Sequence, residues 1–550
     1  MGNPGPPRPG PEASAPGGKL GEVSIAALGQ EYFSFLSRQF PTLCLHDEFI
    51  FFLRLTQAWK HRFQLARLEA PALIDAANRV RAWLSRLENV PLAEKPEDAA
   101  DAAVLRQSLK SVLRELSPGG PWEYDPFLYL KTASLAWAPL LTPATMAEPG
   151  SREELAELLA QTGRLFTWGR TQVRQLSRPG HLLATGAFAD AARFFRRVVP
   201  DFLRTRFPHR TFALLLQEVS RTLEQFREQV AALPPSRDFA RGDAGLAAIL
   251  EESWGWTGGL QRARELLEEE IQASREALAH WAAKLGPGLS WPEALKAMAP
   301  PAAETDQLTL YGQEVSRLWR FWQHSPVLPP PQGSVVVAQT PVFLQTLRSS
   351  ASYAAPWGGP EEKPGYFYIT PMVEDRSHHW QHHRFLSAHE TVPGHHFLDA
   401  LRLTLASPIR RSYESPLYYE GWSCYAETLL LSEGYLDDPR DHLVGWQRRF
   451  WRALRGLADL ELQRGAWSLE QGRQCLRQAS YPEATMRRRI LHLAVNPGYQ
   501  LCYTLGLKEI LRLRERFAPR LGLARFHEIL LSGGQIPFPL VENRLQAAGH

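Results

Sequence analysis

Residues able to hold a metal ion are concentrated in one short segment, residues 387–399, with the sequence SAHETVPGHHFLD. It opens with His389 and Glu390, like the HExxH motif, in which two histidines four residues apart bind zinc and the glutamate acts as a base. Here the fourth residue after His389 is Pro393, and the next histidines are His395 and His396. The residue types therefore indicate metal-assisted hydrolysis, but the spacing departs from the motif.

An unbroken helix brings neither histidine to the right place. Successive residues rotate by about 100° and rise by about 1.5 Å, so His395 would lie about 120° away from His389. His396 would lie about 20° away, but about 10 Å along the helix axis. Pro393 removes a helical hydrogen bond, and Gly394 permits a backbone that other residues avoid. We interpret the Pro-Gly pair as a break that makes His395 the second ligand, with His396 as the alternative.

A third ligand is expected from residues 417–435, LYYEGWSCYAETLLLSEGY. Catalytic zinc sites combine two histidines with a carboxylate and keep one position open for water. Glu420 is the main candidate, and its segment resembles the NEGFAxY segment of zinc aminopeptidases, whose glutamate binds zinc. Glu427, seven residues later, could share the same helix face and is the weaker candidate. The competing interpretation puts Trp422 and Tyr425 in a core and both glutamates at the surface.

Four further histidines, His378, His379, His382 and His383, form two pairs just before this segment. They lack a nearby carboxylate in a base-like position. We expect them at the surface or in a substrate cleft, with a weak secondary metal contact as the alternative.

Helices are expected to position most of these residues. Ser151 and Glu154 form a capping-box pattern, and the apolar residues that follow lie on one helical stripe, as expected for core packing. The pattern changes at residues 325–334, a Pro/Gly-rich loop. Residues 334–341 and 365–371 are predicted as strands, with a loop over 353–365. The fold class is therefore mainly α, a large helical architecture like that of zinc peptidases, with a small β-sheet at the active-site cleft.

The expected organisation has three parts. Residues 1–18 form a disordered Pro/Gly-rich tail. Residues 19–330 form a helical N-terminal portion that walls the cleft, and residues 331–550 form a metal-binding catalytic portion. These two portions could also be one continuous domain.

Composition excludes several classes of protein. A net charge of +4 over 550 residues does not suggest a nucleic-acid partner, and no apolar run suggests a membrane span. The four cysteines are scattered and form no disulfide framework. With no secretion signal at the N-terminus, we expect a cytoplasmic protein of unspecified oligomeric state.

Four segments resemble the domain of unknown function 885 family: HETVPGHH (389–396), EGWSCYAE (420–427), WRALRGLADLELQRGAW (451–467) and PGYQLCYTLG (497–506). Their order and spacing match that family over about residues 335–515. The resemblance implies a largely helical zinc-dependent peptidase. Three positions depart from the family pattern: Gln463 replaces a histidine, Tyr499 replaces a glutamine and His492 replaces an arginine. We expect these positions to orient the ligands or to stabilise an oxyanion, so their replacement puts turnover in doubt more than metal binding.

The predicted mechanism uses one zinc ion held by His389, His395 and Glu420, with Glu390 as general base towards a peptide substrate. Tyr503, alone or with Tyr499 or His492, is expected to donate a hydrogen bond to the developing oxyanion. The strand over 365–371 could present a sheet edge to which an extended peptide adds.

Two other classes stay open. One is a non-catalytic protein that keeps the metal as a staple and binds peptides or a partner, which the three departures favour. The other is a zinc hydrolase of a non-peptide amide or ester. A different divalent ion is also compatible with these ligands.

Overall fold

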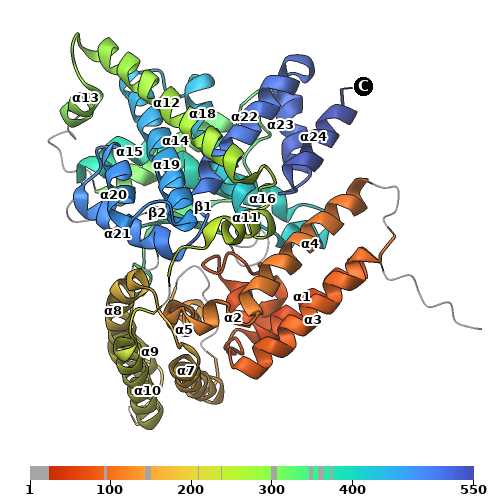
Figure 1. The fold of residues 1–550 in the computed structure, drawn as a ribbon, viewed down its shortest axis with the longest axis vertical. Coiled ribbons are helices and arrows are strands. Elements are labelled where there is room, and N and C mark those ends of the chain that lie inside the picture. Colours follow the sequence, from red (N-terminus) through yellow and green to blue (C-terminus); the bar gives the residue numbers. More distant parts are fainter. Residues whose placement is uncertain are drawn as a thin grey trace, which may run out of the picture.

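The computed structural model describes residues 24–91, 96–142, 150–208, 210–236, 238–298, 306–345, 348, 351–356, 364–371 and 376–549. The expected tail at residues 1–18 lies outside these ranges. The predicted class is confirmed: the chain is mainly α-helical with one small sheet (Figure 1). No helix in the described part of the chain is both long and apolar enough to cross a membrane.

The first group of helices forms the lower half of the molecule in Figure 1. Its members are α1 (Ile25–Gln39), α2 (Pro41–Leu45), α3 (Ala70–Glu88), α4 (Pro96–Leu116), α5 (Pro126–Leu135), α6 (Ala138–Leu141), α7 (Arg152–Gln172), α8 (Arg178–Arg193), α9 (Val199–Arg204) and α10 (Ala213–Ala232). Short 3-10 turns at Thr56–His61 and Pro121–Glu123 and a π-helical turn at Phe194–Val198 connect them. The capping box predicted at Ser151 and Glu154 starts α7.

The second group lies in the upper half (Figure 1). It begins with α11 (Gly242–Glu252), α12 (Gly259–Leu285), α13 (Trp291–Ala297), α14 (Gln307–Trp322), α15 (Arg376–Glu390), α16 (His395–Leu403) and α17 (Pro408–Ser412). It continues with α18 (Pro416–Ser432), α19 (Pro439–Arg464), α20 (Leu469–Arg477), α21 (Glu483–Val495), α22 (Leu501–Leu521), α23 (Leu523–Ser532) and α24 (Phe538–Ala547).

The sheet contains β1 (Val335–Gln339), β2 (Ala351–Ala354) and β3 (Gly365–Ile369), in the order β1-β3-β2. A 3-10 turn at Val342–Leu344 follows β1. Strand β3 pairs in parallel with β1 and antiparallel with β2. Two predictions are wrong here. Tyr353 and Ala354 belong to β2 rather than to a loop, and β3 is the central strand, so its backbone groups are already paired and β1 and β2 are the edge strands.

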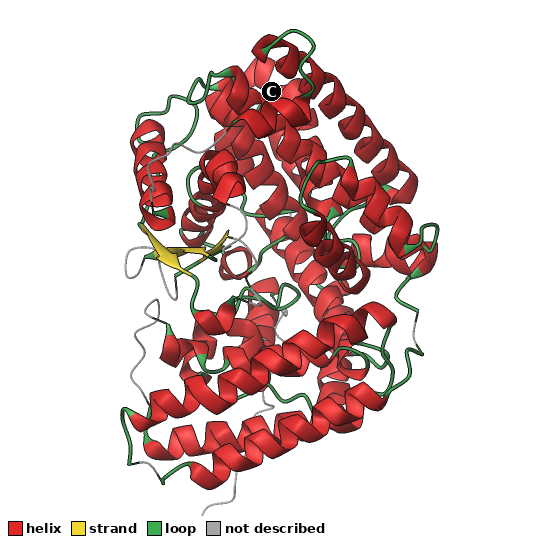
Figure 2. Cartoon of the chain, turned by 90° about the vertical axis from the view of Figure 1, so that its left-hand side faces the viewer, coloured by secondary structure: helices red, strands yellow, loops and turns green. Residues whose placement is uncertain are grey.

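The sheet lies at one side of the molecule, between the two groups of helices (Figure 2). Strand β2 packs against α15, which carries His389 and Glu390 at its C-terminal end. The small sheet is therefore placed beside the candidate site, as predicted.

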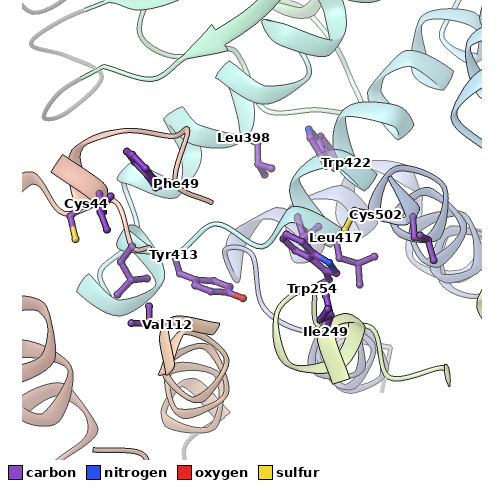
Figure 3. Packing of buried hydrophobic residues seen from close by; sticks show 14 of the residues in the cluster. Cys44, Phe49, Val112, Ile249, Trp254, Leu398, Tyr413, Leu417, Trp422 and Cys502 are labelled. Atoms are coloured by element: carbon purple, nitrogen blue, oxygen red, sulfur yellow. The ribbon is translucent and has the colours of Figure 1, made fainter. Parts of the chain in front are cut away.

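A single buried hydrophobic cluster includes side chains from Ile25 to Leu545. Helix α12, which precedes residue 330, packs along α19, which follows it. Leu417 and Trp422 of α18 and Cys502 of α22 belong to the same cluster (Figure 3). The two portions expected on either side of residue 330 therefore share one core. All four cysteines are free and buried.

Candidate metal centre

The Pro-Gly break ends one helix and starts another. Helix α15 stops at Glu390, and α16 starts at His395 after a four-residue bend. The Gly394 amide donates to the carbonyl of Ala388 at 2.9 Å, which turns the chain back over the end of α15. A Cβ atom at Gly394 would overlap the carbonyl oxygens of His389 and Ala388, so only glycine fits there. This turn brings the His389 and His395 rings to a centroid separation of 4.7 Å.

Both rings direct Nε2 at one carboxylate oxygen. Glu420 Oε2 lies 3.3 Å from Nε2 of His389 and 3.5 Å from Nε2 of His395. Glu420 sits on α18, whose opposite face buries Trp422 and Tyr425 completely. The competing interpretation, with both glutamates at the surface, is therefore wrong, since Glu420 and Glu427 are only 5% and 4% exposed.

These atoms fit a divalent cation. A tetrahedral zinc ion with bonds of about 2.0–2.1 Å separates its ligand atoms by about 3.3–3.4 Å. The separations of 3.3 and 3.5 Å between Glu420 Oε2 and the two Nε2 atoms are close to that spacing. Glu420 Oε2 is buried, and no described residue donates a hydrogen bond to it. Burial opposes ionisation of Glu420, but His389 and His395 outweigh burial and hold the pKa of this carboxyl well below its usual range. The donor set is therefore two imidazoles and one ionised carboxylate.

Glu390 lies beside this group but is held differently. Atoms of His389, Glu390 and His395 all come within 4.8 Å of one another. However, Glu390 Oε2 accepts a hydrogen bond from the Tyr353 amide of β2 at 2.9 Å, whereas Glu420 Oε2 has no donor. We therefore assign Glu420 as the third candidate ligand and Glu390 as a neighbouring carboxylate that is held by the β2 backbone. Burial raises the pKa of Glu390 to about 7, although His395 acts in the opposite direction.

The other nitrogen of each histidine has its own partner. His389 Nδ1 lies 3.0 Å from Glu427 Oε1, and His395 Nδ1 lies 2.8 Å from the Ser423 hydroxyl. Metal-binding histidines usually donate the second ring N–H to such a group, which fixes the tautomer and the ring orientation. Glu420, Ser423 and Glu427 share one face of α18, at positions i, i+3 and i+7.

Two arginines of α19 hold Glu427 in place. Arg448 and Arg452 each form two hydrogen bonds with its carboxylate, at 2.5–2.9 Å. Burial opposes ionisation of Glu427, but the two guanidinium groups outweigh it and lower the pKa of its carboxyl well below the usual range. Glu427 is thus a charged, oriented partner of His389, and no candidate ligand itself.

His396 points away from this group. Its Nε2 lies 3.0 Å from the Gln332 carbonyl, and its Nδ1 lies 3.2 Å from the Tyr353 hydroxyl. The side chain is 1% exposed and does not line the cavity described below. The structure therefore brings His395, and not His396, to His389 and Glu420.

The earlier pairs of histidines are buried, contrary to the expectation of a surface or cleft position. His379, His382 and His383 are 3%, 1% and 6% exposed, and the side chain of His378 lies outside the described residues. His379 Nδ1 bonds the Tyr311 hydroxyl at 2.8 Å, and His383 Nδ1 lies 2.7 Å from the Trp380 carbonyl. They do not line the cavity around the candidate centre.

Two tyrosines also lie at the site: Tyr499 in the turn before α22, and Tyr503 in α22. The Tyr499 hydroxyl donates to Glu420 Oε1 at 2.6 Å, and Tyr503 lies parallel to His389 at a ring separation of 6.4 Å. Asp459 fixes this turn, because its carboxylate accepts hydrogen bonds from the amides of Gly498 and Gln500, both at 3.0 Å. Tyr499 therefore supports the candidate ligand.

Gln463 lies outside the site. It is fully buried and donates to the carbonyls of Leu493 and Ala494, at 2.8 and 3.3 Å. It neither lines the cavity nor contacts a candidate ligand, so the expectation that it orients a ligand or stabilises an oxyanion is wrong. His492, in contrast, lines the cavity.

A cavity of about 800 Å³ opens onto the group. Its walls include His389, Glu390, His395, Glu420 and Tyr503, together with residues of α5, α8, β2 and α21. Such a volume is in the range of pockets for small ligands. Both groups of helices contribute walls, as expected for the N-terminal portion.

Sequence reasoning missed or underrated Ser423, Glu427, Arg448, Arg452 and the Tyr353 amide. Two signals were present. The spacing of Glu420, Ser423 and Glu427 predicts one helix face, and the two arginines are four residues apart on another helix. The hydrogen bond from the Tyr353 amide to Glu390 could not be predicted from the sequence, because every residue except proline has a backbone amide.

Solved structures share this fold. One comes from Colwellia psychrerythraea, with a TM-score of 0.76 and 16% identity, covering 96% of this chain and 99% of that chain. Another comes from Shewanella oneidensis, with a TM-score of 0.78 and 16% identity, covering 95% of this chain and 100% of that chain. Both are described as a "putative lipoprotein", the second as one of unknown function. At this identity the likeness shows the fold alone. No curated protein matches the chain.

The resemblance stated from the four motifs is confirmed by a match to the model of that family. That match spans residues 56–545, from the turn before α3 to the last helix, and so includes both groups of helices. The chain belongs to the family described as bacterial proteins of unknown function, DUF885.

Proposed function

We propose that this chain is a zinc-dependent peptidase. The observation that carries the proposal is the convergence of His389 Nε2, His395 Nε2 and Glu420 Oε2 beside the buried Glu390, at the wall of one cavity. Two imidazoles, one carboxylate and a neighbouring free carboxylate are the groups used for metal-assisted hydrolysis.

A zinc ion, when bound, acts as a Lewis acid and activates water at neutral pH. Glu390 accepts the proton of the attacking water and then delivers it to the leaving amine. Its backbone partner, the Tyr353 amide, holds one carboxylate oxygen and leaves the other for that transfer. Burial raises the pKa of Tyr503, so its hydroxyl stays protonated and is available as a hydrogen-bond donor to the developing oxyanion.

Strand β2 supports a peptide substrate. It is one of the two edge strands of the sheet, packs on α15, and contributes Ser352 and Tyr353 to the cavity wall. An extended peptide can add to such an edge through backbone hydrogen bonds. This role replaces the one expected for residues 365–371.

The first experiment measures metal. Purified protein is dialysed with zinc and then against buffer, and the bound ion is quantified by mass spectrometry. One equivalent is expected, and none in the His389→Ala variant. Absence of bound metal in the intact protein would remove both the peptidase and any other zinc hydrolase.

The second experiment separates catalysis from binding. A peptide library is digested by the zinc-loaded protein, by Glu390→Gln and by Glu433→Gln, a control at the C-terminal end of α18. Loss of the general base lowers the rate by about 10²–10⁴-fold. Bound zinc without digestion of any peptide would instead favour a metal-stabilised binding protein, and ester cleavage alone would favour the non-peptide hydrolase.

A further inference from the structure

One wall of the cavity carries positive charge that the protein does not neutralise. Arg488, Arg489 and His492 project from α21 into the cavity, and Arg455 of α19 lies behind Tyr503, with its guanidinium 5.0 Å from the ring centroid. Helix α21 packs against α8, which lies below it in Figure 1. None of the three guanidinium groups has an ion pair with an acidic residue in the described part of the chain, and His492 adds no charge at neutral pH, because its pKa is lowered to about 4.

Other buried arginines in this chain have carboxylate partners. The pairs are Arg54 with Glu414 (3.2 Å), Arg348 with Asp47 (2.6 Å), Arg402 with Asp399 (2.9 Å), Arg410 with Asp101 (2.7 Å) and Arg448 with Glu427 (2.7 Å). Arg455, in contrast, is only 8% exposed, and its Nε has no hydrogen-bond partner among the described residues. Leaving a buried guanidinium without a counter-ion is unfavourable. Arg455 stacks on Trp451 and Tyr503 and does not line the cavity, so an anion in the cavity would reach Arg489, which acts electrostatically on Arg455 and also lacks a carboxylate partner.

The electrostatics of the cluster agree with this. Burial lowers the pKa of Arg489, and Arg488 lowers it further, whereas the groups that raise it are tyrosines. Burial together with Arg489 and Arg488 lowers the pKa of His492 to about 4. No carboxylate is among the main causes of either pKa shift.

The acidic groups of the cavity are already engaged. Asp47 and Glu48 both pair with Arg348, Glu414 pairs with Arg54, and Asp190 pairs with Arg193 of its own helix. Asp125 accepts a hydrogen bond from the Phe127 amide. The unmatched charge is therefore positive and located at α21. A ligand that neutralises this charge carries a negative group beside α21. A guanidinium group binds a carboxylate through two parallel hydrogen bonds.

We propose that Arg489 and Arg488 bind the free C-terminal carboxylate of a short peptide, which makes the enzyme act near the carboxyl end of its substrates. The inference rests on the proposed peptidase function for the identity of this ligand. The same cavity holds Glu390 and the candidate metal ligands, so a peptide anchored at α21 extends towards them along β2. The cavity volume suits a ligand of a few residues and not a folded protein.

The test measures binding without turnover. Zinc-loaded, full-length Glu390→Gln protein is titrated with dansyl-Ala-Ala-Ala as the free acid, as the C-terminal amide, and with dansyl-Ala-Glu-Ala amide. Fluorescence anisotropy gives the dissociation constants. The free acid is expected to bind about 30-fold more tightly than either amide, the lower end of the effect of losing one partner of a buried charge pair. Equal binding of the three peptides, or no binding of any, would overturn the proposal. Tight binding of the glutamate-containing amide would also overturn it, since a side-chain carboxylate would then suffice.

Variants of the arginines test which residue is responsible for the tighter binding of the free acid. Arg489→Gln is expected to abolish it, Arg489→Lys to restore part of it, and Arg488→Gln to reduce it. Arg487→Gln is the matched control, because Arg487 is on the same helix, is 69% exposed and pairs with Glu483. Arg488 is exposed, so its variant decides the outcome if Arg489→Gln does not fold. A preference unchanged in both variants would contradict the assignment.

The two proposals can fail separately. Preferential binding of the free acid without any cleavage by the wild-type protein would leave the carboxylate site standing and remove the peptidase. Cleavage of the acid and the amide peptides with equal kcat/KM, together with equal binding, would support the peptidase and remove the carboxylate site.

Discussion

Glu427 Oε1 lies 3.0 Å from His389 Nδ1, on the side of the imidazole ring opposite Glu420. His389 is thus placed between two carboxylates of one helix, at positions 420 and 427. Because Arg448 and Arg452 neutralise Glu427, only Glu420 retains an oxygen without a donor. This difference separates the candidate ligand from the residue that orients the ring.

Replacing Glu427 by glutamine is expected to weaken zinc binding without removing a ligand. Loss of such an orienting partner typically costs about 10–100-fold in metal affinity. The substitution also leaves Arg448 and Arg452 without their counter-charge, so the free energy of unfolding should fall. Competition with a zinc-chelating dye gives the affinity, and Glu433→Gln serves as control. An unchanged affinity would show that Glu427 has only a structural role.

The two adjacent histidines should behave differently. His395→Ala is expected to lose stoichiometric zinc, because its Nε2 faces Glu420. His396→Ala should keep the metal but lose about 1–3 kcal/mol of stability, since the buried Tyr353 hydroxyl loses its hydrogen-bond partner. Zinc content and chemical unfolding of both variants measure this contrast. Loss of zinc in His396→Ala with retention in His395→Ala would exchange the two assignments.

The pH dependence follows from the ionisation of Glu390. Burial raises its pKa to about 7 from the ordinary 4.5. A general base works only when it is ionised, so kcat/KM should decrease as the pH falls through this pKa. A bound cation favours the ionised carboxylate, so in the zinc-loaded protein this decrease should begin at a pH below about 7. A pH profile of peptide hydrolysis measures it. A rate that rises on acidification from pH 7 would contradict the role of Glu390.

Gly421→Ala is expected to damage both stability and the site. A Cβ atom at this position would lie 2.5 Å from the Cα of Gly506, where α18 crosses α22. Overpacking of this kind typically costs about 1–3 kcal/mol. Because Glu420 is the preceding residue, separation of the helices also displaces a candidate ligand. The unfolding temperature and the zinc affinity should therefore decrease together. In contrast, Gly312→Ala, with open space for a Cβ inside α14, should leave the zinc affinity unchanged and raise the unfolding temperature slightly, because alanine favours a helix.

The sequence by itself determined the helical class, the capping box at Ser151, two of the three strands, and the set His389, Glu390, His395 and Glu420. These features depend on local chemistry. Hydrophobic periodicity, helix capping and the break at Pro-Gly act over a few residues, and a motif can be recognised from its residue types without knowing the tertiary fold. The family was recognisable for the same reason, since its motifs are short and ordered.

Only the tertiary structure decided which of these groups meet. The choice of His395 over His396 depends on the direction of the turn at Gly394, and the role of Glu427 depends on the packing of α19 beside α18. The assignment of β2 as an edge strand requires the pairing of three segments far apart in sequence. That the arginines of α21 lack a counter-ion can be recognised only from the positions of the nearby carboxylates in the folded chain. Such relationships arise from long-range packing, which residue types and spacing do not encode in a readable form.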